Sequence, residues 1–183
     1  MQRQSALTIA TGTLLIMASA CLAKPTSSRV AFRATAKDNL GRHITAKPKG
    51  GLILGSKVIG NKELFTLVDM NGAGLQDGDA VQIQFASGKH PSYWIEEKGK
   101  VTRTTGRPTG ACTFKVKWKQ KNKSVLLRTA SGKFVSGPGK AKDLVATSKP
   151  NDPASVFELI KNPSPIKTQS KKQPKKQTKK ASH

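Results

Sequence analysis

The most informative part of the sequence for the fold reads Val125-Leu126-Leu127-Arg128, then Ser131-Gly132-Lys133-Phe134-Val135-Ser136, then Leu144-Val145-Ala146-Thr147, then Phe157-Glu158-Leu159. Each segment is short and rich in branched aliphatic or aromatic residues, which favours β-strands. Turn formers separate the segments, such as Ser131-Gly132 and Gly137-Pro138-Gly139. Glycine permits the positive φ that tight turns require. Residues 125–159 therefore predict four short strands.

The same plan of four segments occurs twice upstream. The first copy has segments at 30–34, 41–46, 52–54 and 64–68; the second has them at 81–85, 87–90, 101–104 and 113–117. Two landmarks test this register: a turn glycine (Gly41, Gly88, Gly132) and a phenylalanine that opens the last segment (Phe65, Phe114, Phe157). The two landmarks lie 24, 26 and 25 residues apart in the three copies. A single repeat of this length cannot close its own core, so the three repeats are expected to share one.

Composition limits the remaining possibilities. The 183 residues suit one domain with appendages, and 33 Lys and Arg against 10 Asp and Glu give a net charge of +23. Two cysteines and three histidines argue against a disulfide scaffold and a structural zinc site. The charge indicates an anionic partner.

Three four-stranded units, each with a Gly-Lys/Arg turn and a Phe-led closing strand, resemble a β-trefoil, and the third unit resembles the fascin-like branch of that fold. The resemblance covers residues 24–160 and implies an all-β domain, a six-stranded barrel capped by three hairpins. The second unit departs most, because Pro91 interrupts its hairpin and Tyr93-Trp94-Ile95 resembles an inserted strand. The Q-x-W signature of ricin-type lectins does not occur around Trp94 or Trp118. Ligands differ widely among β-trefoils, so the resemblance implies no particular ligand.

Residues 1–23 have the layout of a secretory signal peptide. Arg3 precedes an apolar run that is shorter than a membrane span, and small residues follow at 18–20. We therefore expect a secreted or periplasmic protein without a stable membrane span after cleavage. Cleavage after Ala20 or Ala23, and lipid attachment at Cys21, are alternatives. An uncleaved N-terminal anchor is a further alternative.

Residues 161–183 form a polycation with eight lysines and no acidic residue. A Gln-x-Lys-Lys unit occurs three times in succession, and its lysines are Lys171, Lys172, Lys175, Lys176, Lys179 and Lys180. Repulsion between like charges and the lack of apolar residues predict a disordered tail that contacts anionic polymers.

Five lysines alternate with other residues along one predicted strand and the turn after it, at Lys115, Lys117, Lys119, Lys121 and Lys123. At least the first three are expected on one face, about 6.6 Å apart, because side chains alternate along a strand. No Asp or Glu occurs between Lys98 and Lys142, and Lys133, Lys140 and Lys142 add further charge. These eight lysines are the predicted ligand-binding residues. Trp118 is expected to lie in the core in preference to stacking on a ligand.

No pattern indicates catalysis, a cofactor or a metal. His43 and His90 occupy corresponding Gly-basic-His turns, which repetition explains. Glu96 and Glu97 are adjacent and point to opposite faces of a strand, so they cannot act as a carboxylate pair. Asp77-Gly78-Asp79 is a turn too short for a calcium loop, and Cys112 is a small core residue.

The sequence thus predicts a secreted, non-enzymatic protein that binds an anionic polymer, with a surface glycan or glycosaminoglycan as the favoured partner. Nucleic acid is an alternative, because the same electrostatics attract it. A module that binds a host or cell-surface protein, as an actin binder or a protease inhibitor, is another. An inhibitor would need a stiff exposed loop, and Gly106-Arg107-Pro108-Thr109-Gly110 is the candidate.

Overall fold

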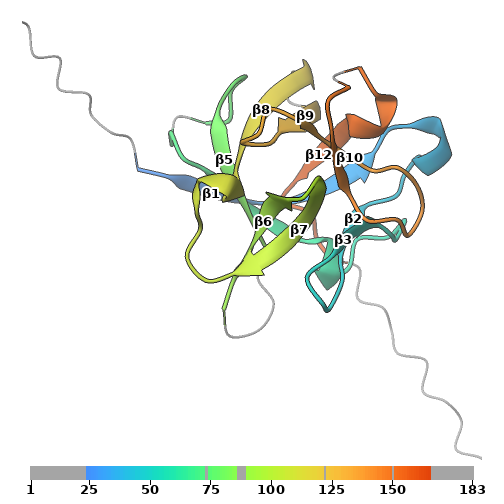
Figure 1. The fold of residues 1–183 in the computed structure, drawn as a ribbon, viewed down its shortest axis with the longest axis horizontal. Coiled ribbons are helices and arrows are strands. Elements are labelled where there is room, and N and C mark those ends of the chain that lie inside the picture. The colour runs from blue at the N-terminus through green and yellow to red at the C-terminus, as the bar shows by residue number, and fades with distance from the viewer. Residues whose placement is uncertain (1–23, 73, 86–89, 122, 150, 166–183) are drawn as a thin grey trace, which may run out of the picture.

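The computed structural model describes residues 24–165, except 73, 86–89, 122 and 150. The predicted signal peptide (1–23) and the repeated lysines of the predicted tail (Lys171 to Lys180) lie outside the described residues. The described part of the chain is built from short β-strands (Figure 1).

The strands fall into three sets of four, as the repeats predict. The first set is β1 (Thr26–Ala34), β2 (Ile44–Ala46), β3 (Leu52–Leu54) and β4 (Phe65–Asp69). The second set is β5 (Ala80–Phe85), β6 (Ser92–Glu97), β7 (Lys100–Thr105) and β8 (Thr113–Gln120). The third set is β9 (Ser124–Arg128), β10 (Phe134–Ser136), β11 (Val145–Thr147) and β12 (Phe157–Lys161). Strand β12 therefore includes Lys161, the first residue of the predicted tail.

The first and last strands of the three sets form a closed ring. β1 pairs with β4, β4 with β5, β5 with β8, β8 with β9, β9 with β12, and β12 returns to β1, all antiparallel. Closure into a barrel leaves these strands without a free edge. The ring is the six-stranded barrel that the resemblance to a β-trefoil implies.

The middle strands of each set form three hairpins, β2–β3, β6–β7 and β10–β11. The hairpins contact one another through short bridges, which pair Gly51 with Thr102, Ile53 with Asp143 and Val145 with Lys100. These mutual contacts hold the three hairpins together as a cap, so the predicted architecture is confirmed.

The second repeat differs from the prediction in one hairpin. Its second strand is β6, so Tyr93-Trp94-Ile95 is the regular strand of the repeat and not an insertion. Residues 87–89 of the segment expected in its place lie outside the described residues. Pro91 precedes β6, where its missing N–H removes no bond from the sheet. The hairpin turns at Lys98-Gly99, whose φ angles of 51° and 75° fit a two-residue type I′ turn.

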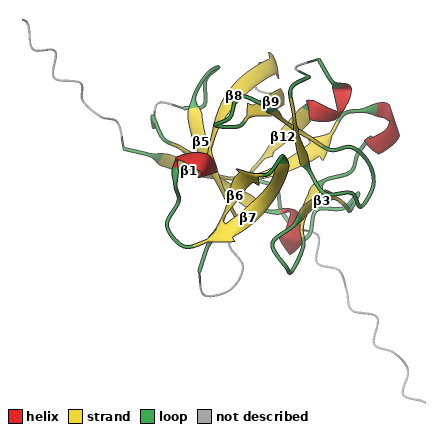
Figure 2. Cartoon of the chain, viewed as in Figure 1, coloured by secondary structure: helices red, strands yellow, loops and turns green. Residues whose placement is uncertain are grey.

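Each repeat positions its phenylalanine in the same way. One 3-10 turn precedes each of the strands β4, β8 and β12. These turns are η2 (Asn61–Glu63), η3 (Gly110–Cys112) and η4 (Pro153–Ser155). A further turn, η1 (Lys37–Asn39), follows β1. The last residue of each of η2, η3 and η4 is buried, which explains Cys112 as a small interior residue. Helix is confined to these short turns (Figure 2), and no helix in the described ranges is long and apolar enough to span a membrane.

The repeats share one aromatic core. Phe65, Phe114 and Phe157 are each at most 1% exposed. Trp94, from β6, is fully buried, and its ring centroid lies 5.1 Å from that of Phe65 and 6.3 Å from that of Phe114. Both pairs are edge-to-face, an arrangement that the ring quadrupole favours. Trp94, which the sequence analysis assigned to an inserted strand, therefore fills the common centre.

Replacing Phe114 by alanine should lower the free energy of unfolding by about 3–5 kcal/mol, because it removes a buried ring from beside Trp94. Leu40 is 62% exposed, so Leu40→Ala should change it by no more than about 0.5 kcal/mol. Urea denaturation of the three proteins measures both values. Equal, small losses in the two variants would contradict the shared core.

Candidate functional site

The predicted lysine face is present on β8. Phe114 and Val116 point into the core, whereas Lys115, Lys117 and Lys119 are exposed. This alternation confirms the predicted orientation of the strand and places the charged groups on the outer wall of the barrel.

The lysine row changes direction near the end of β8. A β-bulge lies between Trp118 and Gln120, so Lys119 is the extra residue of the strand. The Lys123 N–H donates to the Gln120 carbonyl at 3.0 Å and closes the turn to β9. Lys121 and Lys123 are exposed in this turn and do not continue the strand face.

A cation that the sequence analysis missed lies beside the lysine row. Antiparallel pairing of β8 with β9 places Arg128 directly opposite Lys115. Two like charges opposite one another on neighbouring strands are destabilising unless an anion compensates them. The apolar run of β9 ends at the exposed Arg128, and this change is a signal that could have revealed the pair.

Lys115 and Arg128 line a cavity of about 650 Å³, which we call the β8–β9 groove; its other lining residues are Gly110, Thr113, Thr129, Ala130, Ser131 and Gly132. The Arg128 Nε donates to the Gly132 carbonyl at 2.9 Å, which fixes the guanidinium at one end of the groove. The lining contains no carboxylate and three hydroxyl side chains. Ser131 and Thr129 donate their hydroxyl hydrogens to the Glu96 carboxylate, so the groove offers two cations, the Thr113 hydroxyl and two hydroxyl oxygens that can accept hydrogen bonds.

The other predicted lysines are not part of this surface. Lys133 forms an ion pair with Glu96, with 3.4 Å between Nζ and Oε1. Burial would raise the pKa of the Glu96 carboxyl, but hydrogen bonds from Ser131 and Thr129 and the charge of Lys133 lower it below its ordinary value. Lys133 is thus partly compensated by an acid that is distant in sequence.

Lys140 and Lys142 lie in the loop after β10, at the hairpin cap. The backbone of Lys140 forms an isolated β-bridge with Leu54 of β3, and the Ala141 N–H donates to the Leu54 carbonyl at 2.9 Å. Both lysines are exposed, but they belong to a different part of the molecule from the row on β8.

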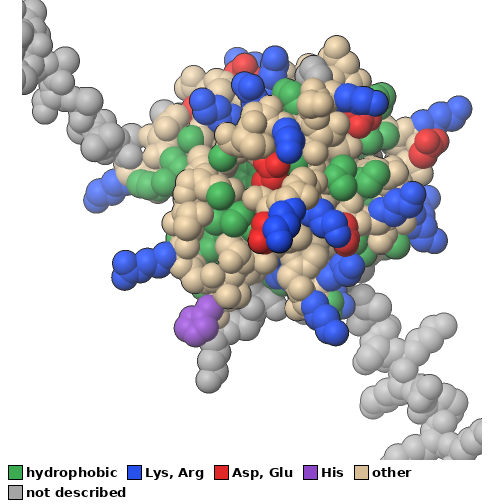
Figure 3. All heavy atoms as spheres, viewed as in Figure 1, with side chains coloured by type: hydrophobic (Ala, Val, Ile, Leu, Met, Phe, Trp, Pro, Cys, Tyr) green, Lys and Arg blue, Asp and Glu red, His purple; other side chains and the backbone are tan. Residues whose placement is uncertain are grey.

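The row on β8 and the turn after it carries uncompensated charge. Three ion pairs occur among the described residues, and none includes Lys115, Lys117, Lys119, Lys121 or Lys123. Lys and Arg side chains are also spread widely over the face drawn in Figure 3, with fewer acidic groups between them.

Trp118 is half-buried and packs against the core, as expected of a residue on the inner face of β8. Its backbone N–H donates to the Asp77 carboxylate at 2.6 Å. The turn Asp77-Gly78-Asp79 therefore supports β8. The described residues include no cluster of His, Cys, Asp or Glu suited to a metal ion.

The two histidines of the corresponding turns lie in different environments. His90 is exposed, whereas His43 is only 3% exposed and its Nδ1 lies 3.2 Å from the Ser56 carbonyl oxygen. Burial lowers the pKa of His43, outweighing the opposite effects of Ser56, Glu63 and Glu158, and the charge of Arg33 lowers it further. His43 is a buried structural residue.

The predicted inhibitor loop is exposed from Gly106 to Gly110. It enters η3 at Gly110, where the Cys112 N–H donates to the Thr109 carbonyl at 2.9 Å. The end of the loop is therefore anchored to the buried Cys112.

Comparison with known proteins supports the fold. The family model of the Fascin domain matches residues 75–159, which contain β5 to β11 and the first part of β12. A Caenorhabditis elegans protein of unknown function superimposes with a TM-score of 0.55 at 11% identity, covering 77% of this chain and 97% of that one. The designed threefold symmetric protein ThreeFoil superimposes with a TM-score of 0.55 at 13% identity, covering 72% and 97%. No curated protein matches the sequence.

These comparisons confirm the resemblance to fascin-like β-trefoils. The family match includes the second repeat, which the sequence analysis expected to depart most. Domains of this kind are generally binding modules and not enzymes. The two solved structures share the fold at low identity and carry no information on a ligand.

The buried His43 should make stability fall as the pH decreases below about 6.5, the ordinary pKa of histidine. The native state holds His43 neutral, whereas the unfolded chain takes up a proton at this residue. The contribution of His43 to the free energy of unfolding is therefore complete above pH 6.5, and it is lost as the pH falls from there toward the lowered native pKa. Urea denaturation between about pH 7.5 and 5.5 should show a smaller pH dependence for His43→Gln than for the unmodified protein.

His90→Gln provides the matched control, because His90 is exposed. It should keep the pH dependence of the unmodified protein. An unchanged dependence in His43→Gln would contradict the buried neutral histidine.

Proposed function

We propose that this fascin-like β-trefoil is a secreted binding protein for anionic polymers, with sulfated surface glycans or glycosaminoglycans as the favoured ligands. The folded part of the site consists of the lysines of β8 and the β8–β9 groove. The Lys-rich C-terminal segment adds contacts along the polymer, and residues 1–23 direct secretion.

One observation carries the proposal: Lys115, Lys117 and Lys119 are exposed on one strand and Arg128 lies opposite Lys115. In the described ranges these four cations form no ion pair with a carboxylate. The strand geometry spaces Lys115 and Lys117 by about 6.6 Å, which suits contacts with successive anionic groups of a polymer.

Counterion release explains the strength expected of such a surface. A polyanion holds a layer of condensed cations, and each lysine that replaces one of them gains the entropy of the released ion. Affinity should therefore fall steeply with salt, and specificity should be modest.

The groove favours a sulfated sugar over a nucleic acid. Thr113, Thr129 and Ser131 line it beside Lys115 and Arg128. Ser131 and Thr129 donate to Glu96, so their oxygens can only accept hydrogen bonds from sugar hydroxyls, and Thr113 can donate or accept. Non-specific contact with nucleic acid depends mainly on phosphate charge. Secretion would also bring the protein to surface glycans.

A second candidate function is recognition of a protein partner through the loop at 106–110. Its exposed residues and its anchored C-terminal end support an inhibitor or another protein-interaction module. Actin binding would need access to the cytosol, so an uncleaved N-terminus in cells would favour that alternative.

The triple variant Lys115→Gln, Lys117→Gln, Lys119→Gln should bind a sulfated glycosaminoglycan about tenfold or more weakly at moderate salt. The slope of log affinity against log salt should become shallower by about two to three, because up to three counterions are no longer released. Calorimetry or fluorescence titration at several salt concentrations measures both effects.

The matched control removes three exposed lysines elsewhere, Lys37, Lys57 and Lys149, and changes the net charge equally. It should retain most of the affinity and the salt slope. Equal losses in both triple variants would show a generic polycation, and tight, salt-insensitive binding of a neutral sugar would overturn the proposal.

Removing residues 166–183 separates the folded site from the tail. The truncated protein should bind more weakly but still lose affinity when the β8 lysines are replaced. Equal competition by single-stranded DNA and a short sulfated glycan of the same charge would favour the nucleic-acid alternative.

A further inference from the structure

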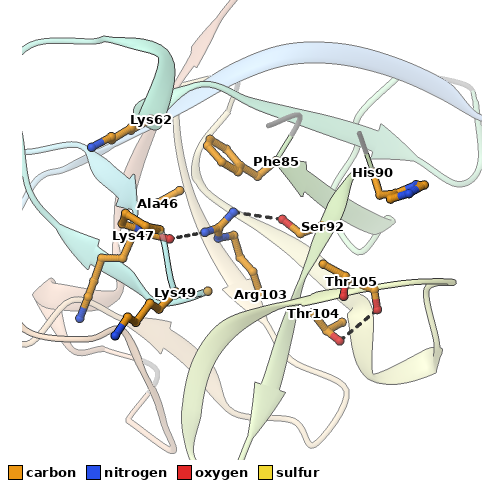
Figure 4. Close-up of a pocket in the computed structure, with 12 residues that line it drawn as sticks. Ala46, Lys47, Lys49, Lys62, Phe85, His90, Ser92, Arg103, Thr104 and Thr105 are labelled. Atoms are coloured by element: carbon orange, nitrogen blue, oxygen red, sulfur yellow. Dashed lines mark hydrogen bonds between the residues drawn. The ribbon is translucent and has the colours of Figure 1, made fainter. Parts of the chain in front are cut away.

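A second cavity lies where the β2–β3 turn meets the β6–β7 hairpin (Figure 4). It has a volume of about 590 Å³, within the range of small-molecule sites. Basic side chains line it, namely Lys47, Lys49, Lys62, His90 and Arg103. We call it the Arg103 pocket.

The guanidinium of Arg103 lies at the centre of the pocket, with Lys47, Lys49 and Lys62 to one side of it and His90 to the other. Its Nη1 donates to the Ser92 hydroxyl at 3.1 Å, and its Nη2 donates to the Lys47 carbonyl. Its Cζ atom lies 4.4 Å from the centre of the Phe85 ring. Three contacts thus fix the position of the charge.

None of these contacts supplies a negative charge. Burial lowers the pKa of Arg103, so the site desolvates the cation. Its Nε is buried and has no hydrogen-bond partner among the described residues. A partly desolvated cation held only by neutral groups is unfavourable until an anion joins it.

Two of the three lysines strengthen this imbalance, whereas the charge of the third is compensated. Lys47 pairs with Asp143, at 3.1 Å between Nζ and Oδ1. Lys49 and Lys62 are exposed and form no ion pair in the part of the chain that the structure describes. The residues that line the pocket include no Asp or Glu.

The backbone around the pocket is fixed in place. The Arg103 N–H donates to the Gly50 carbonyl at 2.8 Å, which ties β7 to the β2–β3 turn. Gly50 has a φ of +90°, and a Cβ there would lie 3.3 Å from the Arg103 carbonyl oxygen. A side chain would therefore disturb the turn that carries Lys47 and Lys49.

We propose that the Arg103 pocket binds one tetrahedral oxyanion, a sulfate or phosphate monoester carried by a monosaccharide. Each Arg103 Nη atom keeps a second N–H after its contact with Ser92 or Lys47, and a planar guanidinium suits a tetrahedral oxyanion. Lys49 and Lys62 add charge at the rim, and Thr104 and Thr105, which also line the pocket, offer hydroxyl groups to the sugar. This site is distinct from the β8–β9 groove and does not depend on it.

The test titrates the full chain with glucose 6-sulfate, glucose 6-phosphate and glucose, and follows binding by calorimetry and by NMR of the backbone amides around the pocket. Both esters, or one of them, should bind saturably to one site, and glucose should not. The preferred ester identifies the oxyanion.

Arg103→Lys keeps the charge but loses the planar fork, and it should weaken binding by about tenfold or more. Lys49→Gln and Lys62→Gln should each weaken it by about threefold to tenfold. Lys57→Gln, an exposed lysine that does not line the pocket, should have no effect.

If Arg103→Lys does not fold, the two exposed lysine variants decide the matter, because neither side chain is buried. The absence of saturable binding, or equal losses in Lys57→Gln and the pocket variants, would overturn the proposal. The β8 triple variant should still bind the monosaccharide ester, and loss of that binding would also overturn it. Failure of glycosaminoglycan binding at β8 would leave this result unaffected.

Discussion

The structure depends on one long strand, β1, that pairs with two other strands. Residues 26–30 of β1 pair with β4, and residues 30–34 pair with β12, so Val30 is paired on both sides. This double pairing joins the start of the first repeat to the end of the third and closes the barrel. Without it, Phe65, Phe114 and Phe157 would lack a common interior, because no single repeat buries its own phenylalanine. The exposed lysines of β8 and the Arg103 pocket are positioned only because that interior is complete.

Strand positions and the threefold plan could be predicted because they depend on local patterns. Apolar alternation in β8 and the recurring Gly-to-Phe spacing are visible in the chain itself. The β6 strand was taken for an inserted strand because its turn, Lys98-Gly99, contains a lysine with positive φ, which a sequence pattern does not reveal. The aromatic Trp94 appeared to be an insertion because its packing partners come from distant strands, β1, β4 and β8.

The candidate site, like the fold, could be predicted from the sequence only in part. The exposure of Lys115 and Lys117 could be predicted because apolar and basic residues alternate along β8. Which charged residues lie near these lysines depends instead on how the strands pair. The sequence lacks acids from 98 to 142, yet Glu96 reaches Lys133 across the fold, and Arg128 comes to lie opposite Lys115. The Arg103 pocket was not predicted because the β2–β3 turn, η2 and the β6–β7 hairpin converge there, and no single segment carries its pattern.

The fold thus places its cations in two different physical environments. Lysines on the barrel wall are surrounded by water, where salt screens a charge within about 8–10 Å. Arg103 is partly buried and held by a hydroxyl, a carbonyl and an aromatic ring, so screening by salt affects it less and geometry affects it more. A long sulfated polymer that contacted both would have a strongly salt-dependent contribution from the wall and a selective contribution from the pocket. Affinity and selectivity would then arise from separate residues and could change independently.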